Sequence, residues 1–155
     1  MEGVKHQLYD RFPPSESCTC DICRAYCERP GWPLVEEARL AIQAGLFRRY
    51  MLEFAPDLSF GILAPAFRGN EAQFAIQRFA HAGCTFLTEE GCTIFDTPYR
   101  PLECRFCHHD RKGKGLACHL ALAKDWNTSK GKRTVSRWLE MIGLRYPENY
   151  PRVRT

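Results

Sequence analysis

The stretch SCTCDICRAYC, residues 17–27, holds four cysteines within eleven positions: Cys18, Cys20, Cys23 and Cys27. Such a group can form disulfides, act as a redox pair, bind a metal or pack in a core. If the stretch is helical, Cys20, Cys23 and Cys27 stand at i, i+3 and i+7 and share one face. Cys18 then points to the opposite side, unless it lies ahead of the helix and folds back. Three thiols on one face exceed the two of a redox pair and resemble corners of a thiolate-bound metal ion or cluster.

A second group of thiols lies downstream, and its spacing also suits a metal. It comprises Cys84, Cys92 and the C-x2-C pair Cys104 and Cys107, which can place two thiolates on one ion. With the first stretch, this makes eight thiols in two sets of four. Isolated buried cysteines pack as small apolar residues, but eight clustered ones predict metal binding.

Two histidines and the ninth cysteine lie close to the second group. His108 and His109 directly follow Cys107, and either imidazole can replace a thiolate or orient a ligand through a hydrogen bond. Cys118 lies in the apolar helical stretch CHLALA, with Leu122 four residues further on. We therefore expect Cys118 to be a core thiol.

The composition is that of a soluble globular protein. The chain has 155 residues and a net charge of +4, which suits one domain and is too mild to indicate nucleic-acid binding by itself. The segment MEGVKHQLYDRF lacks the apolar region of a secretory signal, and no apolar run approaches ~18 residues. We expect a cytoplasmic location and no membrane contact. Cytosolic thiols stay reduced, and nine cysteines cannot all pair, so disulfides are disfavoured.

The positive charge is concentrated in residues 111–133. This stretch has seven basic residues and one acid, Asp125, a local charge of +6. Such a stretch can meet phosphates or an acidic protein partner. A solvated lysine-rich loop beside a helix is the simpler interpretation.

The remaining pattern predicts short elements around the thiols. We expect a helix from Pro33 to about Gly45, short apolar segments at 47–54 and 60–67, a hairpin around the TEEG turn, and helices near 116–126 and 130–143. The predicted fold class is α+β, a small helix-rich single domain with a short β-hairpin and irregular metal-stabilised loops. The domain spans residues 1–155, with a metal-binding core at about 17–110 and C-terminal helices at about 116–143.

Three pieces of the chain, in this order, resemble the YkgJ-like cysteine-cluster family, also called the CxxCxxCC zinc- or iron-chelating domain. They are CTCDICRAYCERPGW, GCTFLTEEGCTIFD and YRPLECRFC. The resemblance covers about residues 18–107. The first cluster departs from the family pattern, because it reads C-x-C-x2-C-x3-C and lacks an adjacent pair of cysteines.

The resemblance implies metal chelation by eight cysteines, and members of the family are often described as iron–sulfur oxidoreductases. Carried over residue by residue, the implied metal ligands are Cys18, Cys20, Cys23, Cys27, Cys84, Cys92, Cys104 and Cys107. Cys118 falls outside this set.

Thiolate-rich sites select zinc, copper(I) or iron–sulfur clusters. A continuous run of closely spaced thiols is typical of cluster-binding loops, whereas zinc sites usually combine two separated C-x2-C knuckles. We expect an iron–sulfur cluster, for instance [4Fe–4S], or Zn²⁺ as the cofactor.

The sequence thus predicts a cysteine-ligated metal-binding protein with an accessory or redox role. One alternative is a small redox iron–sulfur metalloenzyme, although no catalytic residue is assigned. Another is a structural-zinc protein that binds nucleic acid or an acidic protein partner through the basic 111–133 stretch.

Overall fold

The structure is a computed structural model that describes residues 5–18, 20–55, 59–111 and 113–145. The α-helices are α1 (Leu8–Arg11), α2 (Asp21–Glu28), α3 (Val35–Gln43), α4 (Leu102–Phe106), α5 (Gly115–Trp126) and α6 (Ser129–Ile142). Short 3-10 helices are η1 (Phe47–Arg49), η2 (Gln77–Ala82) and η3 (His109–Arg111). The strands are β1 (Tyr50–Phe54), β2 (Gly61–Pro65), β3 (Leu87–Thr88) and β4 (Gly91–Cys92). The predicted α+β class is confirmed; the stabilisation of its loops by metal and the single-domain boundaries stay predictions.

The strands form two small antiparallel pairs. β1 pairs with β2, with Tyr50 opposite Pro65 and Phe54 opposite Gly61. Pro65 is the last residue of β2, a place where its missing N–H is tolerated. β3 and β4 form the predicted hairpin, with Leu87 opposite Cys92. The segment between β1 and β2 includes residues 56–58, which lie outside the described residues.

The predicted C-terminal helices are confirmed to within one residue at each end. The Thr128 side chain caps α6 by accepting a hydrogen bond from the Gly131 backbone N–H at 3.1 Å. Gly143 ends α6 in the left-handed conformation, with φ 84°. The helix expected from Pro33 begins two residues later, at Val35, because Leu34 takes an extended conformation as its N-cap.

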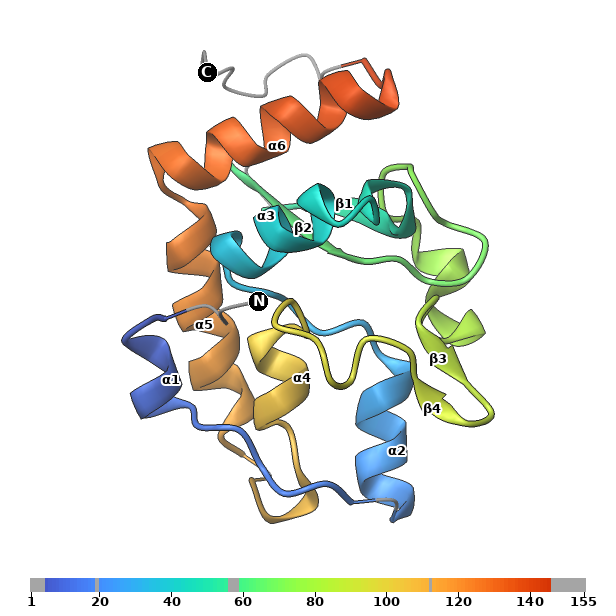
Figure 1. The fold of residues 1–155 in the computed structure, drawn as a ribbon, viewed down its shortest axis with the longest axis vertical. Coiled ribbons are helices and arrows are strands. Elements are labelled where there is room, and N and C mark those ends of the chain that lie inside the picture. The colour runs from blue at the N-terminus through green and yellow to red at the C-terminus, as the bar shows by residue number, and fades with distance from the viewer. Residues whose placement is uncertain (1–4, 19, 56–58, 112, 146–155) are drawn as a thin grey trace.

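The main apolar core lies between α3, α6 and the β1–β2 pair. Figure 1 shows α6 at one end of the molecule, beyond α3 and the two strands, and α2 at the opposite end. Fully buried members of this core include Leu52, Trp126, Val135 and Trp138. The indole N–H of Trp126 donates to the Pro33 carbonyl oxygen at 2.7 Å, so its polar edge is also satisfied. The cysteines of the first stretch are not members of this core.

A second apolar cluster joins α1, α4 and α5. Its buried members are Leu8, Phe12, Leu34, Leu102, Phe106, Cys118 and Leu122. Cys118 is fully buried there, as expected of a core thiol. The Glu37 carboxylate connects these elements because it accepts hydrogen bonds from the Leu34 N–H at 2.7 Å, the Leu102 N–H at 2.9 Å and the Tyr9 hydroxyl at 2.5 Å.

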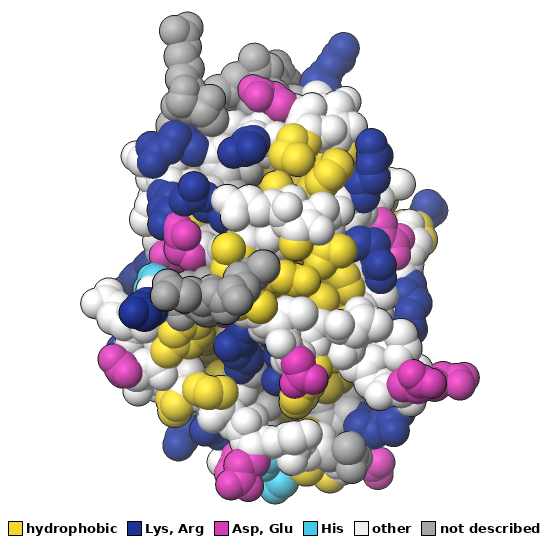
Figure 2. Space-filling view, viewed as in Figure 1, with side chains coloured by type: hydrophobic (Ala, Val, Ile, Leu, Met, Phe, Trp, Pro, Cys, Tyr) yellow, Lys and Arg dark blue, Asp and Glu magenta, His cyan; other side chains and the backbone are white. Residues whose placement is uncertain are grey.

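The basic 111–133 stretch does not form one element. Its described residues are divided between η3, α5 and α6, and Lys130 makes an ion pair with Glu36. On the face seen in Figure 2, Lys and Arg side chains are spread over many parts of the surface. Binding of nucleic acid or an acidic partner through this stretch stays a prediction. In the described part of the chain, no helix has the length and apolar character needed to cross a membrane.

Candidate metal centre

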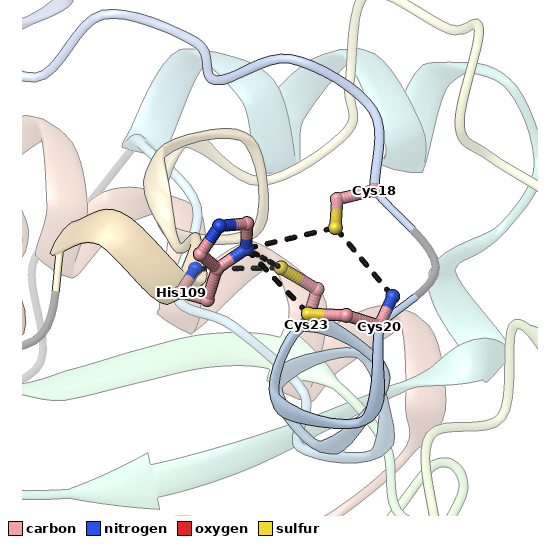
Figure 3. Close-up of side chains that lie close together, drawn as sticks. All are labelled: Cys18, Cys20, Cys23 and His109. Carbon is pink, nitrogen blue, oxygen red and sulfur yellow. Dashed lines mark hydrogen bonds between the residues drawn. The ribbon is translucent and has the colours of Figure 1, made fainter.

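Three cysteines of the first stretch and one histidine converge on a single point (Figure 3). The ligand atoms of Cys18, Cys20, Cys23 and His109 all lie within 4.8 Å of one another. The His109 Nδ1 atom lies 3.6 Å from Cys18 Sγ, 3.5 Å from Cys20 Sγ and 3.4 Å from Cys23 Sγ. The group can therefore hold a metal ion.

These separations fit one tetrahedral ion. With bonds of about 2.3 Å to sulfur and about 2.0–2.1 Å to nitrogen, tetrahedral geometry places neighbouring S and N ligand atoms about 3.6 Å apart. In a four-iron cluster, each thiolate binds a different iron atom, so the ligand atoms stand farther apart than around one ion. The four residues thus have the spacing of a mononuclear Cys3His site.

The start of α2 positions the three thiols. Cys20 is the N-cap residue of α2 in an extended conformation, and Cys23 lies in the first helical turn. Cys18 precedes the helix, and its Sγ accepts a hydrogen bond from the Cys20 backbone N–H at 3.5 Å. Cys18 therefore folds back onto the helix start, the arrangement that lets a residue ahead of the helix join the same site.

Residues 13–18 form an N-terminal arm, and contacts with α4 and η3 hold this arm near His109. The Ser15 N–H donates to the Arg105 carbonyl oxygen at 2.7 Å, and the Arg111 guanidinium donates to the Pro13 carbonyl oxygen at 2.5 Å. The backbone N–H of His109 itself donates to Cys23 Sγ at 3.3 Å. His108 is not a member of this group and pairs with Asp110, with 2.6 Å between Nδ1 and Oδ1. Of the two adjacent histidines, His109 is therefore the candidate ligand.

The electrostatics of the group differ from one thiol to the next. Interaction with the backbone N–H of Cys23, at the start of α2, lowers the pKa of Cys20 to about 7. Burial raises the pKa of Cys23 to about 11. The hydrogen bond from the His109 backbone N–H lowers this pKa, but by less than burial raises it. Cys20 and His109 are exposed while Cys23 is buried, so the site opens to solvent on one side.

The other five predicted ligands line a cavity that adjoins this group. They are Cys27, Cys84, Cys92, Cys104 and Cys107, and all of them border a cavity of about 1030 Å³ that Cys18 and Cys23 also reach. Among the described residues, these five do not form a group as tight as that around His109. The structure thus brings together Cys18, Cys20 and Cys23 from the predicted ligands, and leaves Cys27 with the downstream thiols.

Desolvation raises the pKa of four of these thiols, those of Cys84, Cys92, Cys104 and Cys107. It raises the pKa of Cys84 to about 11 and of Cys107 to about 11, and it raises that of Cys104 well above its ordinary value. Repulsion between neighbouring thiolates acts in the same direction, between Cys104 and Cys84 and between Cys107 and Cys27. Cys84, Cys92, Cys104 and Cys107 are therefore protonated at neutral pH unless a metal displaces the protons.

Two polar side chains of α4, those of Glu103 and Arg105, have structural partners. Glu103 accepts from the Trp32 backbone N–H at 3.1 Å and contacts His119 Nδ1 at 2.8 Å. The Arg105 guanidinium donates to the Arg100 and Thr97 carbonyl oxygens at 2.9 and 2.8 Å. These bonds hold α4, and with it Cys104, against the preceding loop.

The fold and this site define a small α+β domain with a Cys3His group able to hold a metal ion. Comparisons with protein-family models, curated proteins and solved structures find no match. The functional proposal is therefore built on the geometry of this chain.

Proposed function

We propose that this protein binds a zinc ion through Cys18, Cys20, Cys23 and His109. The observation that carries the proposal is the set of S···N separations of 3.4–3.6 Å between three thiols and one imidazole. Thiolate and imidazole ligands in tetrahedral geometry suit Zn²⁺, whereas Mg²⁺ and Ca²⁺ prefer oxygen ligands. Four protein ligands leave no open position, which favours a structural or carrier role over catalysis by this ion.

A second metal at the cavity thiols is part of the same proposal. Cys27, Cys84, Cys92, Cys104 and Cys107 border one cavity, and their sequence context resembles the YkgJ-like family, whose cysteines imply chelation. Five reduced thiols can supply four ligands to a zinc ion or to an iron–sulfur cluster. The Cys3His group has three thiols, whereas the cavity has at least the four that a [4Fe–4S] cluster needs, so the cavity suits the redox alternative.

Metal analysis of protein purified without oxygen tests both sites. Zinc at one equivalent without iron supports the first site alone, whereas a brown protein with iron, sulfide and zinc supports both. Protein that carries neither metal, and does not take up zinc when refolded with it, overturns the proposal.

Matched variants assign the metals to residues. We expect Cys23→Ser to lose zinc and keep whatever metal the cavity thiols hold, and Cys104→Ser to do the opposite. Cys118→Ala is the control, because Cys118 is a buried core thiol outside both groups. Equal metal loss in all three variants would contradict the assignment.

A further inference from the structure

Four basic side chains surround a groove between α3 and α6, and α6 lies at the end of the molecule opposite α2 (Figure 1). The groove has a volume of about 240 Å³, and its cations are Arg39 from α3 and Lys130, Arg133 and Arg137 from α6. All four side chains are exposed. The three on α6 stand at i, i+3 and i+7, so they follow one face of the helix. Only two of the four belong to the basic 111–133 stretch, so the fold gathers a different set of charges from the one that the sequence suggests.

Buried residues of the same two helices hold this groove in shape. Ile42 of α3 and Thr134 of α6 also line it, and both are buried. The Thr134 hydroxyl donates to the Lys130 carbonyl oxygen at 2.9 Å. On the inner side of α6, Trp138 and Leu139 are fully buried in the main apolar core. The four cations are therefore carried by two helices whose positions the core fixes.

Only part of this positive charge is neutralised within the described chain. Glu36 pairs with Lys130 and with Arg39, and its Oε1 atom lies 3.1 Å from Arg39 Nη1. Arg133 and Arg137 make no ion pair with any described residue. Counted with Glu36, four cations and one carboxylate leave a local charge of +3. Such a groove attracts anionic groups.

The side chains around the groove favour phosphate groups over an acidic protein surface. Three of the four cations are arginines, and the planar guanidinium can donate two parallel hydrogen bonds to one phosphate. Protein interfaces have aromatic and apolar side chains at their centre. Among the described residues that line this groove, Ile42 is the single apolar one and none is aromatic. The composition is therefore that of a nucleic-acid interface, which is more polar and more positive.

The same lining favours a duplex over other phosphate compounds. Pockets for small organic ligands usually have volumes of about 300–1,000 Å³ and are mostly apolar, whereas this groove is smaller and basic. Binding of single strands relies on bases that stack on aromatic side chains, and the described lining has none. Contacts to the phosphates of a double strand need only the cations.

We propose that the groove between α3 and α6 binds the phosphate backbone of double-stranded nucleic acid, without regard to base sequence. From Lys130 to Arg137 the cations of α6 span about 10 Å of helix axis. One strand of a duplex carries a phosphate about every 3.4 Å of its axis, so this length faces about three phosphates. The proposal goes beyond the metal sites and does not depend on either of them.

The test measures binding of a fluorescently labelled DNA duplex of mixed sequence by anisotropy, between about 50 and 200 mM salt. We expect the logarithm of the affinity to fall with the logarithm of the salt concentration, with a slope of about −3. Arg133→Gln combined with Arg137→Gln should reduce the size of this slope by about 2. The control combines Arg78→Gln with Lys124→Gln, which removes the same charge from exposed positions outside the groove. Its slope should match that of the parent, and equal melting temperatures will show that all variants fold.

Glu36→Gln tests the groove in the opposite direction. The change removes the carboxylate that pairs with Lys130 and Arg39, so both cations become available to phosphates. We expect the variant to bind the duplex several-fold more tightly than the parent at the same salt concentration. Unchanged or weaker binding would place the duplex elsewhere on the protein and overturn the groove as its site.

Three further results would overturn the proposal. The first is a parent protein that does not bind the duplex at about 50 mM salt. The second is an equal loss of binding in the groove variant and in its control, because the effect would then follow net charge alone. The third is displacement of the duplex by polyglutamate or by inorganic phosphate beyond the effect of ionic strength, which would assign the groove to an acidic protein or to a single phosphate group.

Discussion

The two groups of thiols differ in how far apart along the chain their members lie. Cys18, Cys20 and Cys23 fall within six residues, and only His109 is remote. The cavity thiols come from α2, from the segment before β3, from β4 and from α4, spanning Cys27 to Cys107. A helix start sets the geometry of neighbouring residues without help from a ligand, whereas distant segments depend on the whole fold to meet.

The pKa values of the thiols also differ, both between the two groups and within the Cys3His group. The start of α2 lowers the pKa of the exposed Cys20, while burial raises the pKa of Cys23 in the same group and those of Cys84 and Cys107 in the other. Thiolate is the form that binds metal. The comparison teaches that one thiol of the Cys3His group is readily ionised at neutral pH, whereas Cys23 and the buried cavity thiols would each have to lose a proton to bind a metal.

The largest effect is expected from Cys23→Ser. Structural zinc contributes on the order of 10 kcal/mol of binding free energy, so losing a ligand should lower the melting temperature strongly and abolish zinc binding. Calorimetry and metal analysis measure both. Unchanged zinc content would show that the Cys3His group is not the zinc site, and the contrast between the two groups of thiols would then be wrong.

His109→Ala tests the one remote ligand. We expect zinc affinity to fall by at least about 100-fold, since even the hydrogen-bonding partner of a ligand is commonly worth about 10–100-fold. His108→Ala is the matched control, because His108 pairs with Asp110 instead. Chelator competition measures both variants, and a larger loss in His108→Ala would reverse the assignment of the two histidines.

The Glu37 carboxyl allows a test of whether the pH dependence of folding stability arises from the thiols or from the rest of the fold. Burial raises the pKa of its carboxyl from 4.5 to about 7, so folding favours the protonated form. The resulting stability is fully present below pH 4.5 and is lost as the pH rises towards 7. The loss should approach about 3 kcal/mol, and Glu37→Gln should remove it. Denaturant unfolding between these pH values measures it; an equal slope in Glu37→Gln would assign the dependence to other groups.

A smaller effect is expected from Gly31→Ala, which perturbs the cavity thiols alone. The added Cβ would crowd Cys104 Sγ at 2.5 Å, and overpacking of this kind costs about 1–2 kcal/mol. Gly115→Ala is the control, since a Cβ there meets nothing within 4 Å. We expect Gly31→Ala to lower metal content at the cavity and leave zinc at the Cys3His group unchanged. Loss of that zinc as well would show that the two sites are not independent.

Local patterns in the sequence predicted much of the fold. The helices near 116–126 and 130–143 and the hairpin around TEEG follow from periodicity, caps and turn residues, which act over a few positions. The start of α3 was placed two residues early because the extended conformation of Leu34 has no strong signal.

The ligand set was harder to predict, because it depends on contacts between distant segments. Cys27 lies seven residues after Cys20, about 10 Å along a helix axis, and is not a member of the tight group. The place it leaves is taken by His109, which the sequence offered only as one of two adjacent histidines. The contacts of Ser15 with Arg105 and of Arg111 with Pro13 link residues 90 and 98 positions apart, and no local pattern in the sequence indicates them.

The hydrogen-bonded contact between Cys23 and His109 joins residues separated by 86 positions. An ion at this point would act as a reversible cross-link that closes a long loop, and it would reduce the conformational entropy of the unfolded chain in the way a disulfide does. The main apolar core between α3, β1, β2 and α6 does not include these ligands. Removal of the ion would therefore release the arm that carries Cys18 while this core stays folded, so protease cleavage in residues 13–18 would report metal occupancy directly.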